Sequence, residues 1–120
     1  MSKPVILLAE DEIMLRMIAV EILQDAGFQV FEAGDGVEAL ELLKANPEIS
    51  LLVSDIKMPR MDGYALAEAG LQLKPGLKVL LMTGYAQDPP AHLLEAASLQ
   101  ILHKPFDLDR LCALAAEMTA

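Results

Sequence analysis

The stretch from residue 51 to residue 63 reads LLVSDIKMPRMDG, and it sets the expected fold. Its first residues, Leu51–Val53, form a continuous apolar run, which is typical of a strand covered on both faces. Similar short runs occur elsewhere in the chain, at Val5–Ala9, Val79–Met82 and Ile101–Leu102. Phe28–Glu32 instead alternates apolar and polar residues, as in a half-exposed edge strand. The sequence therefore predicts five short strands.

Helical patterns separate these strands. Between the first two, apolar residues recur at spacings of three and four and predict one helix face: Leu15, Ile18, Ala19, Ile22, Leu23 and Ala26. Gly27 then favours a left-handed stop. Further helices are expected from the capping pattern at Asp35-Gly36-Val37-Glu38 to Asn46-Pro47, from about Gly63 to Leu73, from Pro89-Pro90, and from Asp107 to the end. Strict alternation of strand and helix predicts one doubly wound α/β domain over residues 1–120.

Composition narrows the classes of function. Eighteen acidic and nine basic residues give a net charge of −9, which repels both nucleic acid and anionic lipid. We therefore expect no direct nucleic acid or membrane partner. The start of the chain lacks the pattern of a secretory signal, so a cytoplasmic location is expected. The lone Cys112 falls in a helical stripe with Leu108, Leu111 and Ala115, which predicts a buried apolar role.

Polar residues follow the apolar runs at the points where the strands should end. These residues are Glu10 and Asp11 after the first run, Asp55 after the third, Thr83 after the fourth and Lys104 after the fifth. Parallel strands end at one edge of their sheet, and ligands bind there in open α/β sheets. We therefore expect these side chains to gather at that edge.

The gathered side chains have complementary chemistry. Three neighbouring carboxylates repel one another unless a cation joins them, and Mg²⁺ suits carboxylate and water ligands. A carboxylate can act as a nucleophile and form an aspartyl phosphate. Thr83 can donate a hydrogen bond and Lys104 can supply a positive charge to phosphoryl oxygens. The simpler alternatives are that the acidic pair caps a helix, that Thr83 is an ordinary strand residue and that Lys104 is a surface lysine.

Four motifs together resemble the receiver domain of bacterial response regulators over essentially the whole chain. They are Glu10-Asp11, the segment from Asp55 to Gly63, Met82-Thr83-Gly84-Tyr85 and Lys104-Pro105-Phe106. The resemblance implies a flavodoxin-like (βα)5 fold, with a five-stranded parallel sheet in the order 2-1-3-4-5. It also implies a role in two-component phosphorelay signalling.

The resemblance implies a role for each residue of the site. Asp55 would be the phosphoacceptor, and Mg²⁺ would be bound by Asp11 directly, by Glu10 mainly through water, by Asp55 and by the Lys57 carbonyl. Thr83 and Lys104 would contact the phosphoryl group. The donor would be a phosphohistidine on a sensor histidine kinase or a phosphotransfer protein. Phosphorylation would raise or lower the affinity for an unidentified downstream protein at the face made by helix four, strand five and helix five. It would not be an enzyme beyond assisting its own phosphorylation and dephosphorylation.

The sequence departs from the family pattern at Ile101, where many receivers have a Tyr or Phe that turns inward on phosphorylation. We hypothesise that Tyr85 takes over part of the switching. Lys57 and Tyr85 also occupy the positions that flank the path of hydrolytic water in the family. The alternatives are an interaction-only degenerate receiver, a flavodoxin-type cofactor carrier and an aspartate-dependent phosphatase. Both a stand-alone regulator and a receiver of a hybrid kinase fit this sequence.

Overall fold

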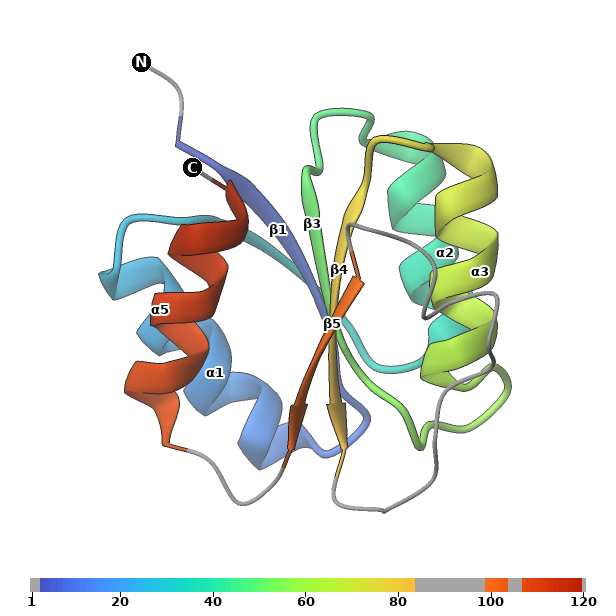
Figure 1. The fold of residues 1–120 in the computed structure, drawn as a ribbon. Coiled ribbons are helices and arrows are strands. Elements are labelled where there is room, and N and C mark those ends of the chain that lie inside the picture. Colours follow the sequence, from blue (N-terminus) through green and yellow to red (C-terminus); the bar gives the residue numbers. More distant parts are fainter. Residues whose placement is uncertain (1–2, 84–98, 104–106, 120) are drawn as a thin grey trace.

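The computed structural model describes residues 3–83, 99–103 and 107–119, in which strands and helices alternate (Figure 1). The elements are β1 (Val5–Ala9), α1 (Ile13–Asp25), β2 (Gln29–Ala33), α2 (Gly36–Ala45), β3 (Leu51–Asp55), α3 (Gly63–Leu73), β4 (Lys78–Thr83), β5 (Leu99–His103) and α5 (Leu108–Thr119). All five predicted strands are present: β1 matches its apolar run, β2 is shifted by one residue, and β3, β4 and β5 are two or three residues longer than their runs. The helix expected from Pro89-Pro90 lies outside the described residues.

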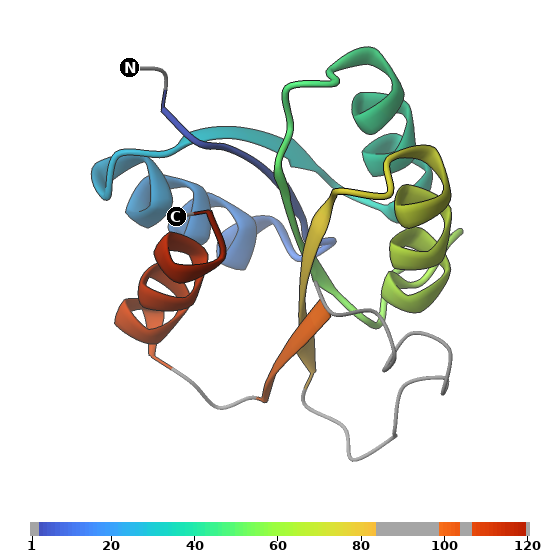
Figure 2. The ribbon, with the colours of Figure 1, turned by 45° about the horizontal axis from the view of Figure 1, so that its top comes forward.

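The five strands form one parallel sheet in the order β2-β1-β3-β4-β5, which confirms the predicted fold. Helices α1 and α5 lie on one face of this sheet, and α2 and α3 lie on the other (Figures 1 and 2). β2 is an edge strand, as its alternating sequence predicts. Because all five strands are parallel, their carboxyl ends lie at the same edge of the sheet, which we call the carboxyl edge.

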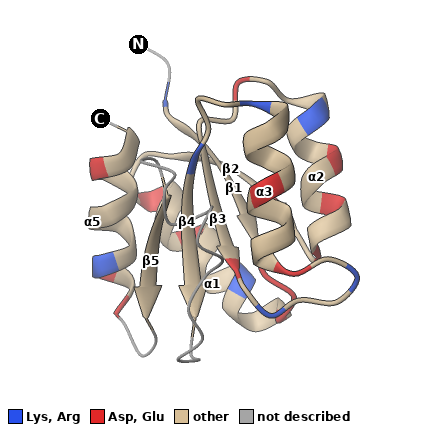
Figure 3. Ribbon diagram, turned by 45° about the vertical axis from the view of Figure 1, so that its right-hand side comes forward, with Lys and Arg blue, Asp and Glu red and all other residues tan. Residues whose placement is uncertain are grey.

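The core consists of two apolar layers, one on each side of the sheet. Within the fully buried strand β1, Ile6 and Leu8 belong to the layer under α1 and α5, whereas Leu7 and Ala9 belong to the layer under α2 and α3. This alternation follows from the two-residue period of a strand. The strands are largely free of charged residues, which lie mainly in the helices and loops (Figure 3).

Side-chain caps fix where three helices begin. The carboxylates of Asp35, Asp62 and Asp107 accept hydrogen bonds of 2.8–2.9 Å from main-chain N–H groups in the first turns of α2, α3 and α5. Such caps satisfy donors that a helix cannot satisfy internally. Gly27 adopts the predicted left-handed conformation, with φ of 101°, just after α1.

The predicted buried face of α1 was partly wrong. Ala19 and Leu23 are buried as expected, and Val20 joins them. Leu15 and Ile18 are instead 44% and 42% exposed, and Ala26 is exposed too. The first half of α1 is apolar nearly all round, so its periodicity does not select one face. Packing against the sheet and α5 determines which residues of α1 are buried. No helix in the described ranges is long and apolar enough to cross a membrane.

The stripe in α5 matches its prediction. Leu111 and Ala115 are buried, and Leu108 and Cys112 pack against the same core layer while remaining half-buried. Burial, with a smaller contribution from the charge of Asp109, raises the pKa of the Cys112 thiol. A thiol that resists ionisation is a poor nucleophile, so this environment agrees with a packing role.

Candidate functional site

The register of the sheet brings the ends of β1 and β3 level with each other. Ala9 pairs with Ser54, so Glu10, the first residue after β1, follows next to Asp55, the last residue of β3. The pairing continues on both flanks, where Glu10 N–H donates to the Ala33 carbonyl at 3.0 Å and Ile56 N–H donates to the Met82 carbonyl at 3.2 Å. Hydrogen bonds on either side therefore fix the main chain at the carboxyl edge.

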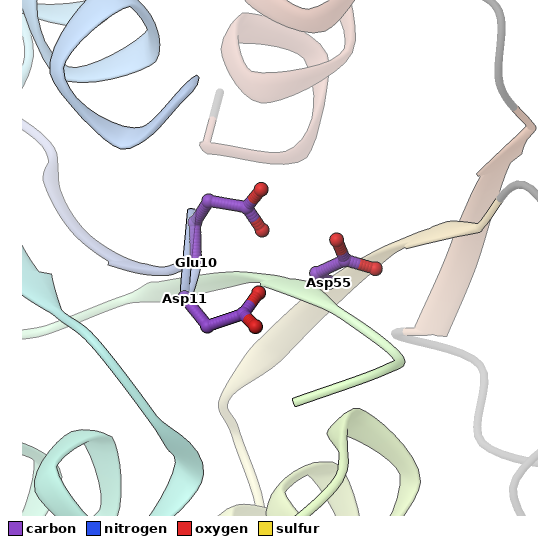
Figure 4. Close-up of side chains that lie close together, drawn as sticks. All are labelled: Glu10, Asp11 and Asp55. Carbon is purple, nitrogen blue, oxygen red and sulfur yellow. The ribbon is translucent and has the colours of Figure 1, made fainter. Parts of the chain in front are cut away.

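Three carboxylates meet at this edge. Glu10, Asp11 and Asp55 each offer one oxygen, and these oxygens all lie within 4.8 Å of one another. Figure 4 shows the carboxyl groups of Glu10 and Asp11 extending toward Asp55. Glu10 is only 4% exposed, Asp55 is half-buried and Asp11 is exposed, so the cluster reaches from the protein interior to the solvent.

This set of donors suits a hard divalent cation. Burial of a carboxylate such as Glu10 is unfavourable unless an opposite charge or hydrogen-bond donors compensate it. A cation that prefers oxygen ligands would also offset the repulsion among the three acids. Lys57, whose carbonyl is the further predicted ligand, lies two residues after Asp55 with its side chain exposed.

The loop after Asp55 is held close to the end of β3. Gly63 N–H donates to the Ile56 carbonyl at 2.7 Å, and Ser54 Oγ donates to the Asp55 carbonyl at 2.8 Å. Within the loop, Arg60 adopts a left-handed conformation with φ of 66°, which is uncommon for a residue with a side chain. The turn predicted from the segment between Met58 and Gly63 is therefore present, and it ends at the first residue of α3.

An ion pair ties this loop to α2. Arg60 donates from Nε and Nη2 to one carboxylate oxygen of Asp35, at 3.1 and 2.7 Å, while the other oxygen accepts the capping bond from Glu38 N–H. Together the Glu38 N–H and the Arg60 guanidinium hold the pKa of Asp35 below its usual range. The sequence indicated Asp35 only as a cap and gave no sign of its pairing with Arg60.

The remaining predicted residues fall into two groups. Thr83 is buried at the end of β4, directly after Met82, the register partner of Asp55. Ile101 lies in β5 opposite Leu81 and packs, half-buried, in the core layer under α2 and α3. Tyr85 and Lys104 lie outside the described residues, so their predicted roles stay predictions. Sequence reasoning overlooked Arg16, which contacts the Glu10 carbonyl.

The fold and the carboxylate cluster together define an α/β domain with a candidate cation site at the carboxyl edge of its sheet. Residues 6–116 match the family described as the response regulator receiver domain, and the chain belongs to this family.

Two curated relatives come from Brucella abortus (strain 2308). The sensor kinase CckA is 42% identical over 115 residues, which are 94% of this chain but only 12% of that protein. The response regulator receiver protein CpdR is 40% identical over 106 residues, which are 86% of each chain. The solved receiver domain of the hybrid histidine kinase CckA is 31% identical, with a TM-score of 0.83 and coverage of 97% of this chain and 99% of that one.

Proposed function

We propose that this protein is a phosphorylation-dependent signalling switch that accepts a phosphoryl group from a histidine kinase phosphohistidine onto Asp55 with Mg²⁺. The observation that carries the proposal is the meeting of Glu10, Asp11 and Asp55 within 4.8 Å in a chain of the receiver family. Asp11 would bind the ion directly, Glu10 mainly through water, and Asp55 and the Lys57 carbonyl would complete the protein ligands. The bound ion would offset negative charge on the acids and on the incoming phosphoryl group.

The chemical step is a transfer of the phosphoryl group between two side chains. A carboxylate oxygen of Asp55 attacks phosphorus in line, an O–P bond forms, and the P–N bond to the donor histidine breaks. The electron pair of that bond stays on the imidazole nitrogen. Thr83 would donate a hydrogen bond to a phosphoryl oxygen, and Lys104 would supply positive charge to another.

The phosphoryl group would then change the binding of a partner. Thr83 ends β4, and its movement toward the phosphate would repack the neighbouring β5 and α5, part of the face that we propose for output. The domain would assist only its own phosphorylation and dephosphorylation, without turnover of a small molecule.

The donor would also need a surface on which to dock. Ile13, Met14 and Met17 are exposed in the first half of α1, which begins two residues after Asp11. Exposed apolar side chains that are grouped together commonly mark protein contacts. We therefore place part of the donor contact on this half of α1, beside the phosphoacceptor.

The test is the intact mass of the protein after incubation with acetyl phosphate and Mg²⁺. Wild type should gain one phosphoryl group, whereas Asp55→Asn, or wild type with a chelator, should gain none. Asp25→Asn is the matched control, because Asp25 is an exposed acid at the end of α1, far from the carboxyl edge. Modification of Asp55→Asn to the level of wild type would refute the assignment. An unmodified wild type would instead favour the alternative of an interaction-only receiver.

A further inference from the structure

Arg16, in the second turn of α1, joins three separate parts of the chain. Its Nη1 donates to the Glu10 carbonyl at 3.1 Å, and its Nε lies 3.3 Å from Oε1 of Glu32 in β2. The side chain is mostly covered, with 19% of its surface exposed, whereas that of Glu32 is 51% exposed. The guanidinium is therefore partly covered and lies between α1, the end of β1 and the edge strand.

With the Arg16 contact, both main-chain polar groups of Glu10, its N–H and its carbonyl, form hydrogen bonds. The Glu10 N–H already donates to the Ala33 carbonyl at 3.0 Å, and Arg16 binds the Glu10 carbonyl. With both main-chain groups held, the direction in which the Glu10 side chain leaves the main chain is fixed. That carbonyl also belongs to the peptide that leads into Asp11, so the same bond restrains the start of the second acid.

Gly34 provides the space that this arrangement needs. An ideal Cβ at Gly34 would lie 2.8 Å from Arg16 Nη1, closer than such atoms approach in proteins. Its φ does not lie in the left-handed region, so the backbone here would accept a side chain. A side chain at Gly34 would therefore require the end of the Arg16 side chain to shift.

We propose that Arg16 is a positioning residue for the acidic cluster, and that it sets the affinity for Mg²⁺ by holding the main chain of Glu10. This inference rests on the proposed function. Arg16 acts through Glu10 and Asp11 and does not touch the ion itself. Groups that orient metal ligands in this way commonly change metal affinity by about tenfold or more when they are removed.

The positive charge of Arg16 would by itself weaken the binding of Mg²⁺, whereas its positioning of Glu10 strengthens it. The negative charge of Glu32 offsets the charge of Arg16. A lone guanidinium near the cluster would repel a divalent cation, and its removal would then strengthen binding. The Glu32 carboxylate lies 3.3 Å from Arg16 Nε, so the pair carries no net charge. Dissolved salt further screens the electric field of the pair at the cluster. Loss of the pair as a whole should therefore reveal the effect of positioning alone.

The test is a calorimetric titration of Mg²⁺ into wild type and the double variant Arg16→Gln/Glu32→Gln, which leaves the net charge unchanged. We expect the double variant to bind Mg²⁺ more weakly than wild type, by about tenfold or more. Lys78→Gln/Glu48→Gln is the matched control, because it removes one cation and one anion that are exposed near the opposite edge of the sheet. That control should bind Mg²⁺ like wild type.

A second readout separates positioning from a general loss of stability. The melting temperature of each protein is measured with and without Mg²⁺, since the ion stabilises the folded state according to its affinity. A double variant that melts earlier but binds Mg²⁺ within twofold of wild type would overturn the proposal. If the double variant does not fold, Gly34→Ala decides the question, because it displaces the guanidinium without altering any charge. Wild type that fails to bind Mg²⁺ would count against the proposed function itself.

Discussion

Gly63 lies directly against the main chain of Asp55. An ideal Cβ at Gly63 would lie 2.8 Å from Cα of Ile56 and closer still to the Asp55 carbonyl oxygen. Gly63 N–H also donates to the Ile56 carbonyl at 2.7 Å. The first residue of α3 thus packs against the backbone of the proposed phosphoacceptor, and any side chain there must push that backbone away.

Gly63→Ala should therefore affect both stability and phosphorylation. Overpacking against the backbone typically costs about 1–3 kcal/mol, which urea unfolding would measure. Displacement of Asp55 should also slow its phosphorylation by acetyl phosphate, followed by intact mass. Gly76→Ala is the control, since nothing lies within 4 Å of a Cβ there, and it should change stability by less than about 0.5 kcal/mol. Equal behaviour of the two variants would contradict the prediction.

Asp35→Asn should lower stability at neutral pH while it preserves a capping oxygen. Hydrogen bonds from Glu38 N–H and then from Arg60 depress the pKa of Asp35 in the folded protein. The stabilisation is therefore complete above the unfolded-state pKa of about 3.9 and is lost as pH falls through the lower folded-state pKa. The stability difference between wild type and variant, from urea unfolding, should be constant near neutral pH and shrink below about pH 4. A difference that persists in strong acid would rule out this linkage.

Lys57→Ala should change the lifetime of the phosphorylated protein. The exposed side chain of Lys57 lies two residues after Asp55, where it can affect the approach of water to the phosphoryl group. The resemblance to receivers predicts a similar effect for Tyr85→Ala. Decay of the phosphorylated form is followed by intact mass, with Lys78→Ala as a control at the far end of β4. Decay curves identical to wild type for both site variants would refute the idea.

Met14→Gln/Met17→Gln should weaken transfer from a phosphorylated histidine donor without changing phosphorylation by acetyl phosphate. Acetyl phosphate is small and would contact only the phosphorylation site itself, whereas a protein donor would also cover the exposed apolar part of α1. We expect a loss of about tenfold or more in the transfer rate, as for an interface residue worth more than about 1.4 kcal/mol. Leu73→Gln removes an equally apolar exposed side chain at the end of α3 and serves as the control. If both variants lose the same rate, α1 is not the docking surface.

Much of this arrangement was predictable because it depends on short-range patterns. The apolar runs predicted the strands, and the acids that follow them were placed at one edge by the parallel direction alone. Two things were not predictable in this way. The buried side of α1 is chosen by its neighbours because the helix offers several apolar faces. The bonds of Arg16 and Arg60 run between elements, and local sequence spacing does not specify where a long side chain will reach.

The two pairs of helices have a further consequence for the encounter with a donor. Helices α1 and α5 cover one face of the sheet and α2 and α3 cover the other (Figure 1), and Asp55 is the last residue of β3, at the carboxyl edge between these two layers. We therefore expect a protein that carries phosphohistidine to approach the domain from this edge. A donor bound at this edge would leave the solvent-facing sides of the helices on both faces of the sheet outside its direct path to Asp55.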